Sequence, residues 1–169
     1  LHSFPTRRSS DLVDIETGKA DVLRIVAAHD VGRAINRAMV LGQFYGGVAM
    51  GLGYGLLEEF EIEGGVPKQL NFDEYLIPTA LDVPPITPII VEHPDPAGPF
   101  GAKSIGEPAN ELAAPAILNA IARATGTRIT ELPATLERVL LGRKLTRTGA
   151  RASLQRTPDE SCKIRPSQP

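Results

Sequence analysis

Hydrophobic and polar residues alternate at residues 13–16 and again at residues 22–28, on either side of a turn at residues 17–19. Alternation on both sides of a glycine-containing turn predicts a β-hairpin. A third strand is predicted at residues 86–91, where Pro88 interrupts an apolar run. Because proline removes a ladder hydrogen bond, we expect Pro88 to break that strand.

The stretch at residues 38–57 carries no charged residue and predicts a helix. Small residues four apart allow another backbone or a flat ligand to approach closely, and five of its six glycines are spaced in this way: Gly42 and Gly46, then Gly47, Gly51 and Gly55. Each glycine costs a helix about 1 kcal/mol relative to alanine, so a compensating contact is expected. Glycines and an acidic run from Glu58 lower the hydrophobicity, which favours a buried helix over the alternative, a membrane span.

A second helical period follows Pro108. Pro115 lies inside it and predicts a kink or an early restart, whereas Gly126 predicts its end. A last short helix is expected at residues 136–141. The apolar side of the main helix is predicted to consist of six residues: Leu112, Ala116, Ile117, Ala120, Ile121 and Ala124.

Glu107 stands between Gly106 and Pro108 at the start of this helix. Pro108 suits the first helical position and biases Glu107 toward an extended conformation, so Glu107 is predicted to be the last residue before the helix. A helix N-terminus favours the ionised carboxylate, which suits a general base. From the residues alone, a simple helix cap is the favoured interpretation, because carboxylates are common at helix starts.

Composition limits the chemistry that the chain can carry by itself. The 169 residues have a formal charge of −2, which gives no electrostatic case for nucleic acid binding. The single cysteine, Cys162, cannot form an internal disulfide or hold an iron–sulfur cluster. His29 and Asp30 follow the second predicted strand; we expect them to anchor a loop through hydrogen bonds, with an acid/base pair as the alternative.

Several motifs occur in one order between about residues 13 and 141. Residues 101–108, followed by residues 112–117, resemble the active-site glutamate segment of the xanthine dehydrogenase/aldehyde oxidase family of molybdenum hydroxylases. Residues 42–53 resemble a cofactor-binding segment of the same family, and residues 75–79 resemble its Tyr-x-Ile-Pro-Thr segment. The chain departs from the family pattern at Arg37, usually proline, and at Met50, often glutamine.

The resemblance implies an α+β fold: a carboxy-terminal fragment of the second molybdopterin-binding domain, with short strands, a glycine-rich buried helix and a second helix after the glutamate loop. It implies oxidative hydroxylation of a purine-like N-heterocycle or an aldehyde, with water as the oxygen source and Glu107 as general base. Gln43 is expected to be a buried amide and would contact the pterin. Lys103, Ser104 and Gly106 would also lie at the cofactor. No residue is expected to ligate metal directly.

The implied cofactor is molybdenum–molybdopterin, in the cytosine dinucleotide form for a bacterial protein. Iron–sulfur and flavin subunits or domains are the implied partners, with a small-molecule substrate, a cytoplasmic location and neither nucleic acid nor a membrane span. A fragment without the rest of its subunit is expected to be inactive and to expose large apolar faces. The alternative hypothesis is a non-catalytic assembly fragment in which Glu107 is only a helix cap.

The resemblance also sets the predicted boundaries. Residues 1–12 resemble a translated sequencing adapter and are set aside from the fold. Residues 13–145 are assigned to the molybdopterin-binding domain. Residues 146–169 are polar and basic without a period, which predicts a disordered tail.

Overall fold

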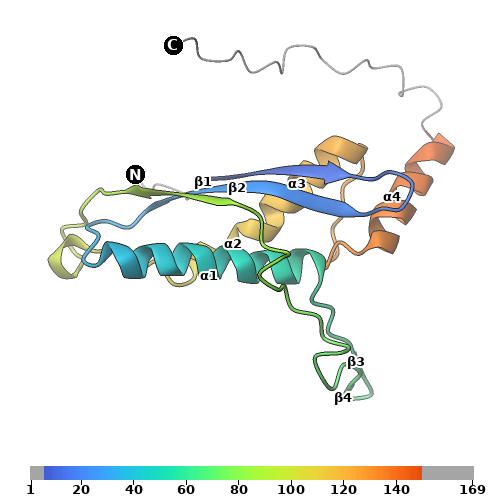
Figure 1. Cartoon of the computed structure of the whole chain (residues 1–169), viewed down its shortest axis with the longest axis horizontal. Helices are drawn as coiled ribbons and strands as arrows, with labels where there is room; N and C mark the ends of the chain where they lie inside the picture. Colours follow the sequence, from blue (N-terminus) through green and yellow to red (C-terminus); the bar gives the residue numbers. More distant parts are fainter. Residues whose placement is uncertain (1–5, 150–169) are drawn as a thin grey trace, which may run out of the picture.

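A three-stranded sheet lies across a layer of helices in the computed structural model, which describes the backbone of residues 6–149 and the side chains of residues 12–142 (Figure 1). Strand β1 (Thr6–Val13) pairs antiparallel with β2 (Ala20–Asp30), and β2 pairs parallel with β5 (Ile86–Val91). The predicted hairpin is confirmed, but its first strand spans residues 6–13, so it shares only Val13 with the predicted strand at residues 13–16. That strand includes part of the segment assigned to an adapter, whose origin stays a prediction.

Helix α1 (Arg37–Leu56) joins the parallel strands β2 and β5. It begins where Asn36 caps it, since the Asn36 side chain accepts a hydrogen bond from the Met39 N–H at 3.1 Å. The predicted helix at residues 38–57 is therefore confirmed almost to its ends. Across the described residues, no helix has the length and apolar character needed to span a membrane.

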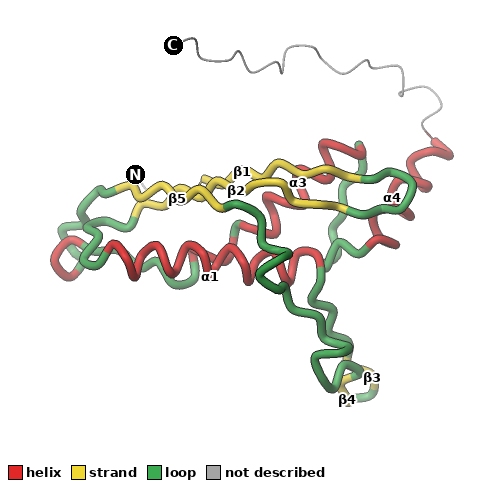
Figure 2. Tube along the Cα trace, in the orientation of Figure 1, coloured by secondary structure: helices red, strands yellow, loops and turns green. Residues whose placement is uncertain are grey.

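The core lies between one face of β2 and the helices α1 and α3, with Val139 of the last helix also in the cluster (Figure 2). Alternate β2 residues, among them Ile25 and Ala27, are buried because a strand points every second side chain to the same face. They pack in one apolar cluster with Phe44 and Ile117. The His29 ring is also buried, with its centroid 4.6 Å from that of Phe44.

Strand β5 is continuous, so the prediction that Pro88 breaks it is wrong. Pro88 pairs in register with Ala27 of β2. Within the part of the chain that the structure describes, β5 is the outer strand of the sheet and one of its edges has no strand neighbour, and proline is tolerated at such an edge.

The helical segment after Glu107 is split into α2 (Pro108–Glu111) and α3 (Ala113–Thr125). This confirms the predicted restart: Pro115 has no N–H to donate to the Glu111 carbonyl, which would be its partner in a continuous helix. The Tyr54 hydroxyl donates to the Asn110 carbonyl at 3.1 Å and reaches the Glu111 carbonyl at 3.5 Å. Tyr54 thus stabilises the break.

The predicted end of α3 is correct, whereas its predicted buried face is partly wrong. Gly126 ends the helix with a left-handed φ of 75°, as expected for a glycine stop. The buried residues of α3 are Ala113, Ala114, Ile117 and Ile121. The predicted face was therefore rotated, because α1 covers the alanine side of the helix.

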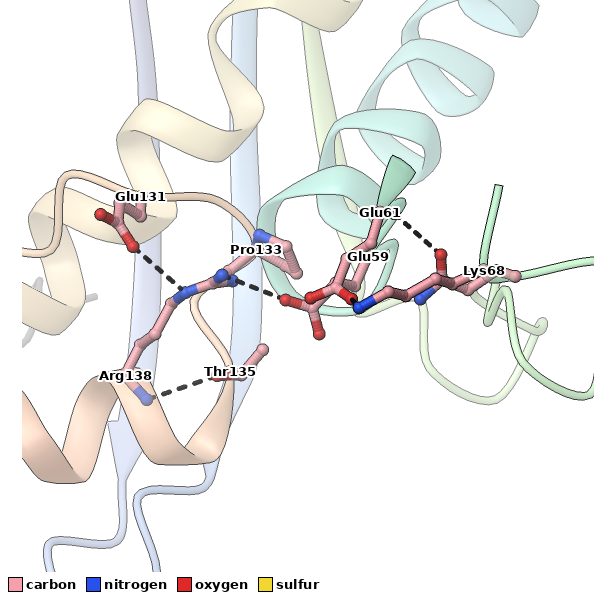
Figure 3. A network of polar contacts seen from close by, with 8 residues as sticks. Glu59, Glu61, Lys68, Glu131, Pro133, Thr135 and Arg138 are labelled. Atoms are coloured by element: carbon pink, nitrogen blue, oxygen red, sulfur yellow. Dashed lines mark hydrogen bonds and ion pairs between the residues drawn. The ribbon is translucent and has the colours of Figure 1, made fainter. Parts of the chain in front are cut away.

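Helix α4 (Leu136–Gly149) is longer than the predicted segment at 136–141 and includes the first four residues of the expected tail. Arg138 fixes its start (Figure 3): the guanidinium pairs with Glu59 at 3.0 Å and donates to the Pro133 carbonyl at 2.8 Å. This network joins α4 to the segment that follows α1. Residues 150–169, the rest of the expected tail, lie outside the described residues.

Residues 57–83 form an arm that projects away from the sheet and carries β3 (Ile62–Glu63) and β4 (Val66–Pro67) (Figures 1 and 2). Tyr75 and Asp82 make hydrogen bonds within the arm and its junction with α1. The Tyr75 hydroxyl donates to Glu58 at 2.5 Å, which raises the Tyr75 pKa. The Thr79 hydroxyl donates to Asp82 at 2.7 Å, which lowers the Asp82 pKa.

The arm exposes many large apolar side chains, as expected for a chain that lacks its neighbours. A pocket of about 520 Å³ lies within it, and none of the predicted site residues lines this pocket. The lining residues are Phe60, Gln69, Leu70, Asn71, Phe72 and Tyr75. The exposed apolar residues of the arm are Phe60, Ile62, Val66, Leu70, Phe72, Leu76, Ile77 and Leu81.

Candidate functional site

Glu107 is the residue immediately before α2, as the sequence predicted. Its backbone is helical (φ −66°, ψ −46°), so the predicted extended conformation is wrong. The reason is visible in the hydrogen bonds: the Glu107 carbonyl already accepts from the N–H of Asn110 at 2.8 Å and of Glu111 at 3.2 Å. These bonds outweigh the bias that Pro108 imposes.

The Glu107 side chain is exposed and makes no capping hydrogen bond to its helix. This geometry does not support the interpretation of Glu107 as a mere side-chain cap, because a capping carboxylate accepts from the first N–H groups of the helix. The carboxylate is therefore accessible to an external ligand.

Three glycines of α1 lie in close contact with α2 and the start of α3. A Cβ at Gly47 would lie 2.5 Å from the carbonyl carbon and oxygen of Ala109, and one at Gly51 would lie 2.9 Å from the Asn110 carbonyl oxygen. One at Gly55 would lie 3.2 Å from the Ala114 Cβ. The glycine ladder confirms the predicted close backbone contact. Since its partners advance in the same direction along both segments, the helices run parallel.

Gln43 lies one turn before Gly47 on α1. Because the helices run parallel, Gln43 lies toward the end of the α1–α2 pair at which α2 begins. Gln43 is exposed, which corrects its description as a buried amide. Among the described residues, and apart from the neighbouring backbone of α1 itself, no heavy atom lies within 4 Å of the position that a Cβ would take at Gly42 or Gly46. This side of α1 is open, whereas the Gly47 side is filled.

Asn110 is a candidate site residue that sequence analysis missed. Its Nδ2 donates to the Met50 sulfur at 3.3 Å, while its Oδ1 is buried without a hydrogen-bond partner among the described residues. A buried amide oxygen left without a donor is costly. The signal in the sequence was its spacing: Asn110 is one helical turn after Glu107.

The loop at residues 101–106 holds the remaining predicted residues. Ser104 and Gly106 are exposed, and Gly106 has open space where a Cβ would point. Lys103 Nζ lies 2.6 Å from Asp30 Oδ2, and Asp30 also accepts from the Gly32 N–H at 2.9 Å. The prediction that Asp30 anchors a loop is thus confirmed, and Lys103 is engaged by that anchor.

The donors and acceptors at this site fit an uncharged or anionic organic ligand. Gln43 supplies an exposed amide and Ser104 an exposed hydroxyl, and Gly42 and Gly46 leave one surface of α1 open. An amide both donates and accepts, which suits the edge of a heterocycle. Within the described residues, no group of three or more His, Cys, Asp or Glu side chains could hold a metal ion.

Comparisons with known proteins identify the family of this chain. The family model of the molybdopterin cofactor-binding domain matches residues 12–84. The xanthine dehydrogenase molybdenum-binding subunit of Escherichia coli O157:H7 is 40% identical over 129 residues, which are 75% of this chain and 17% of the relative. The aldehyde oxidoreductase of Megalodesulfovibrio gigas is 40% identical over 138 residues, which are 76% of this chain and 14% of the relative.

Solved structures give the same result. The crystal structure of quinoline 2-oxidoreductase from Pseudomonas putida 86 superposes with a TM-score of 0.73 at 34% identity, over 78% of this chain and 17% of that one. The chain thus spans about a sixth of the length of these relatives. It belongs to the xanthine dehydrogenase/aldehyde oxidase family of molybdenum hydroxylases and corresponds to part of the molybdenum-binding subunit.

Proposed function

We propose that this chain forms part of the active site of a molybdenum hydroxylase that inserts a water-derived oxygen into an N-heterocycle, purine-like in the first instance, or into an aldehyde. One observation carries the proposal: the Glu107 carboxylate stands immediately before α2, is exposed and makes no capping hydrogen bond. The substrate classes follow the names of the relatives, which include xanthine, aldehyde and quinoline enzymes.

Glu107 would act as a general base. Its carboxylate oxygens would accept the proton from the attacking water-derived oxygen, which requires hydrogen-bond reach of about 2.6–3.2 Å in the assembled site. When bound, molybdenum–molybdopterin, proposed as the cytosine dinucleotide form, supplies the redox chemistry. Gln43 would bind the pterin edge, and the loop with Lys103, Ser104 and Gly106 would donate to its anionic part.

The remaining parts of the enzyme are also proposed. The relatives include a subunit of a dehydrogenase complex and a CO dehydrogenase, which supports iron–sulfur and flavin partners that pass electrons onward. A cytoplasmic location stays a prediction. The assembly hypothesis keeps one observation in its favour, the apolar arm at residues 57–83; a docking role for the arm is compatible with catalysis at Glu107.

Isotope labelling of the full-length enzyme tests the proposed reaction. Turnover of xanthine, quinoline or an aldehyde in H₂¹⁸O is expected to place ¹⁸O in the product, measured by mass spectrometry. The matched control supplies ¹⁸O₂ in ordinary water and should leave the product unlabelled. Label that comes from O₂, or no turnover of any of the three substrates by an enzyme that holds molybdenum, would contradict the proposal.

The proposed pterin contact of Gln43 has its own test. Gln43→Ala removes one amide from the open side of α1, and a hydrogen bond of typical strength is worth about 3- to 10-fold in affinity. Molybdenum retained per subunit after dialysis, measured by elemental analysis, should fall accordingly. Tyr45→Ala is the control, because Tyr45 is exposed on another side of the same helix. Equal molybdenum content in both variants would argue against the contact.

A further inference from the structure

Asp30 stands at the carboxyl end of β2, and its side chain is almost completely buried, with 4% of its surface exposed. Its carboxylate pairs with Lys103 Nζ at 2.6 Å and accepts backbone N–H groups from Gly32 at 2.9 Å and His93 at 3.2 Å. Lys103 is itself 26% exposed. The Asp30 carboxylate therefore joins three segments. Its own position is the end of β2, its hydrogen bond with His93 reaches the segment after β5, and its ion pair with Lys103 reaches the loop that leads to Glu107.

The backbones of the same segments are also in direct contact. The Lys103 N–H donates to the Val31 carbonyl at 2.9 Å, and the Arg33 N–H donates to the Gly101 carbonyl at 2.8 Å. Gly32 has a φ of 64°, and a Cβ there would lie 2.9 Å from the Lys103 nitrogen. The end of β2 and the loop at residues 101–103 are thus packed without room for a side chain.

We propose that Asp30 is a positioning residue that fixes Glu107 through Lys103; this inference rests on the proposed function of Glu107. Glu107 follows Lys103 by four residues, and this short connection includes the flexible Gly106. The loop needs an external anchor to hold the carboxylate in one place. A buried ion pair with directional hydrogen bonds supplies such an anchor, since it specifies geometry more than it adds stability.

A neighbouring ion pair provides the matched control. Arg37 pairs with Glu92 at 2.8 Å, and the two side chains are 63% and 41% exposed. This pair joins the start of α1 to the residue after β5, so it lies beside the Asp30 anchor. It makes no contact with the Glu107 loop in the described hydrogen bonds, and water screens an exposed pair of this kind.

The test uses the full-length enzyme and compares Asp30→Asn, Lys103→Met, the double variant and the control Arg37→Met. Asp30→Asn keeps an acceptor for the Gly32 and His93 N–H groups but removes the charge that holds Lys103. A displacement of about 1 Å at the base costs on the order of 100-fold in rate. We therefore expect kcat per bound molybdenum to fall about 100-fold, with KM little changed.

Two further readouts separate positioning from folding. Amide hydrogen exchange of residues 101–111 should become faster in Asp30→Asn than in wild type or Arg37→Met, and the double variant should lose no more than either single variant, because the two residues act as one unit. Wild-type kcat with unchanged exchange in Asp30→Asn would overturn the inference. So would a loss explained entirely by missing molybdenum.

A Glu107→Gln variant, measured beside these, distinguishes this inference from the proposed function. If Glu107→Gln were fully active, Glu107 would not be the base, and no residue would be needed to position it. An inactive Glu107→Gln variant beside a fully active Asp30→Asn variant would leave the base in place and reject Asp30 alone.

Discussion

Glu107→Gln in the full-length enzyme is expected to lower kcat by about 10²- to 10⁴-fold while the molybdenum content stays at the wild-type level. A general base contributes a factor of this size, and glutamine keeps the shape of the side chain but cannot accept the proton. Because the Glu107 side chain makes no capping hydrogen bond, its replacement should not weaken α2. Steady-state kinetics normalised to bound molybdenum measure the effect.

Glu111→Gln is the matched control for this experiment. Glu111 is also exposed and lies on the same short helix α2, one turn after Glu107. It should keep wild-type kinetics, because only Glu107 is proposed to reach the reacting atoms. Full turnover in Glu107→Gln would show that the base is another residue; a comparable loss in both variants would indicate a nonspecific charge effect.

The sequence predicted those features that local chemistry determines. A proline without an N–H ends α2 before α3, and Gly126 takes the left-handed conformation that ends α3. The glycine spacing of α1 predicted a close backbone contact, because several glycines in one helix require a compensating neighbour. The carboxylate of Glu107 at the start of α2 followed from the residues on either side of it.

Features that depend on distant neighbours were not predicted. The continuous strand through Pro88 requires knowledge that β5 is at the edge of the sheet. The exposure of Gln43 depends on which side of α1 is covered by α2, and alternation of glycines alone does not decide this. The ion pair of Asp30 with Lys103 joins residues 73 positions apart. Considered separately, Asp30 was predicted to anchor a loop and Lys103 to lie at the cofactor.

The two glycine sides of α1 are expected to respond in opposite directions to the same substitution. Gly47→Ala places a Cβ 2.5 Å from the Ala109 carbonyl atoms, so α1 and α2 must separate, and overpacking of this kind costs about 1–3 kcal/mol. Gly46→Ala places its Cβ in open space, so the better helix propensity of alanine should stabilise α1 by up to about 1 kcal/mol. Urea unfolding of the purified chain, followed by far-ultraviolet circular dichroism, measures both free energies of unfolding.

Gly46→Ala and Gly47→Ala, tested in the full-length enzyme, also distinguish an effect on helix packing from an effect on ligand binding. If the open side of α1 faces the cofactor, Gly46→Ala should reduce the molybdenum retained per subunit even though it stabilises the chain, because its methyl group occupies the space a flat ligand needs. Gly47→Ala should reduce stability first and molybdenum only as a consequence of that loss. Normal molybdenum retention in Gly46→Ala would mean that another part of the subunit covers this side of the helix.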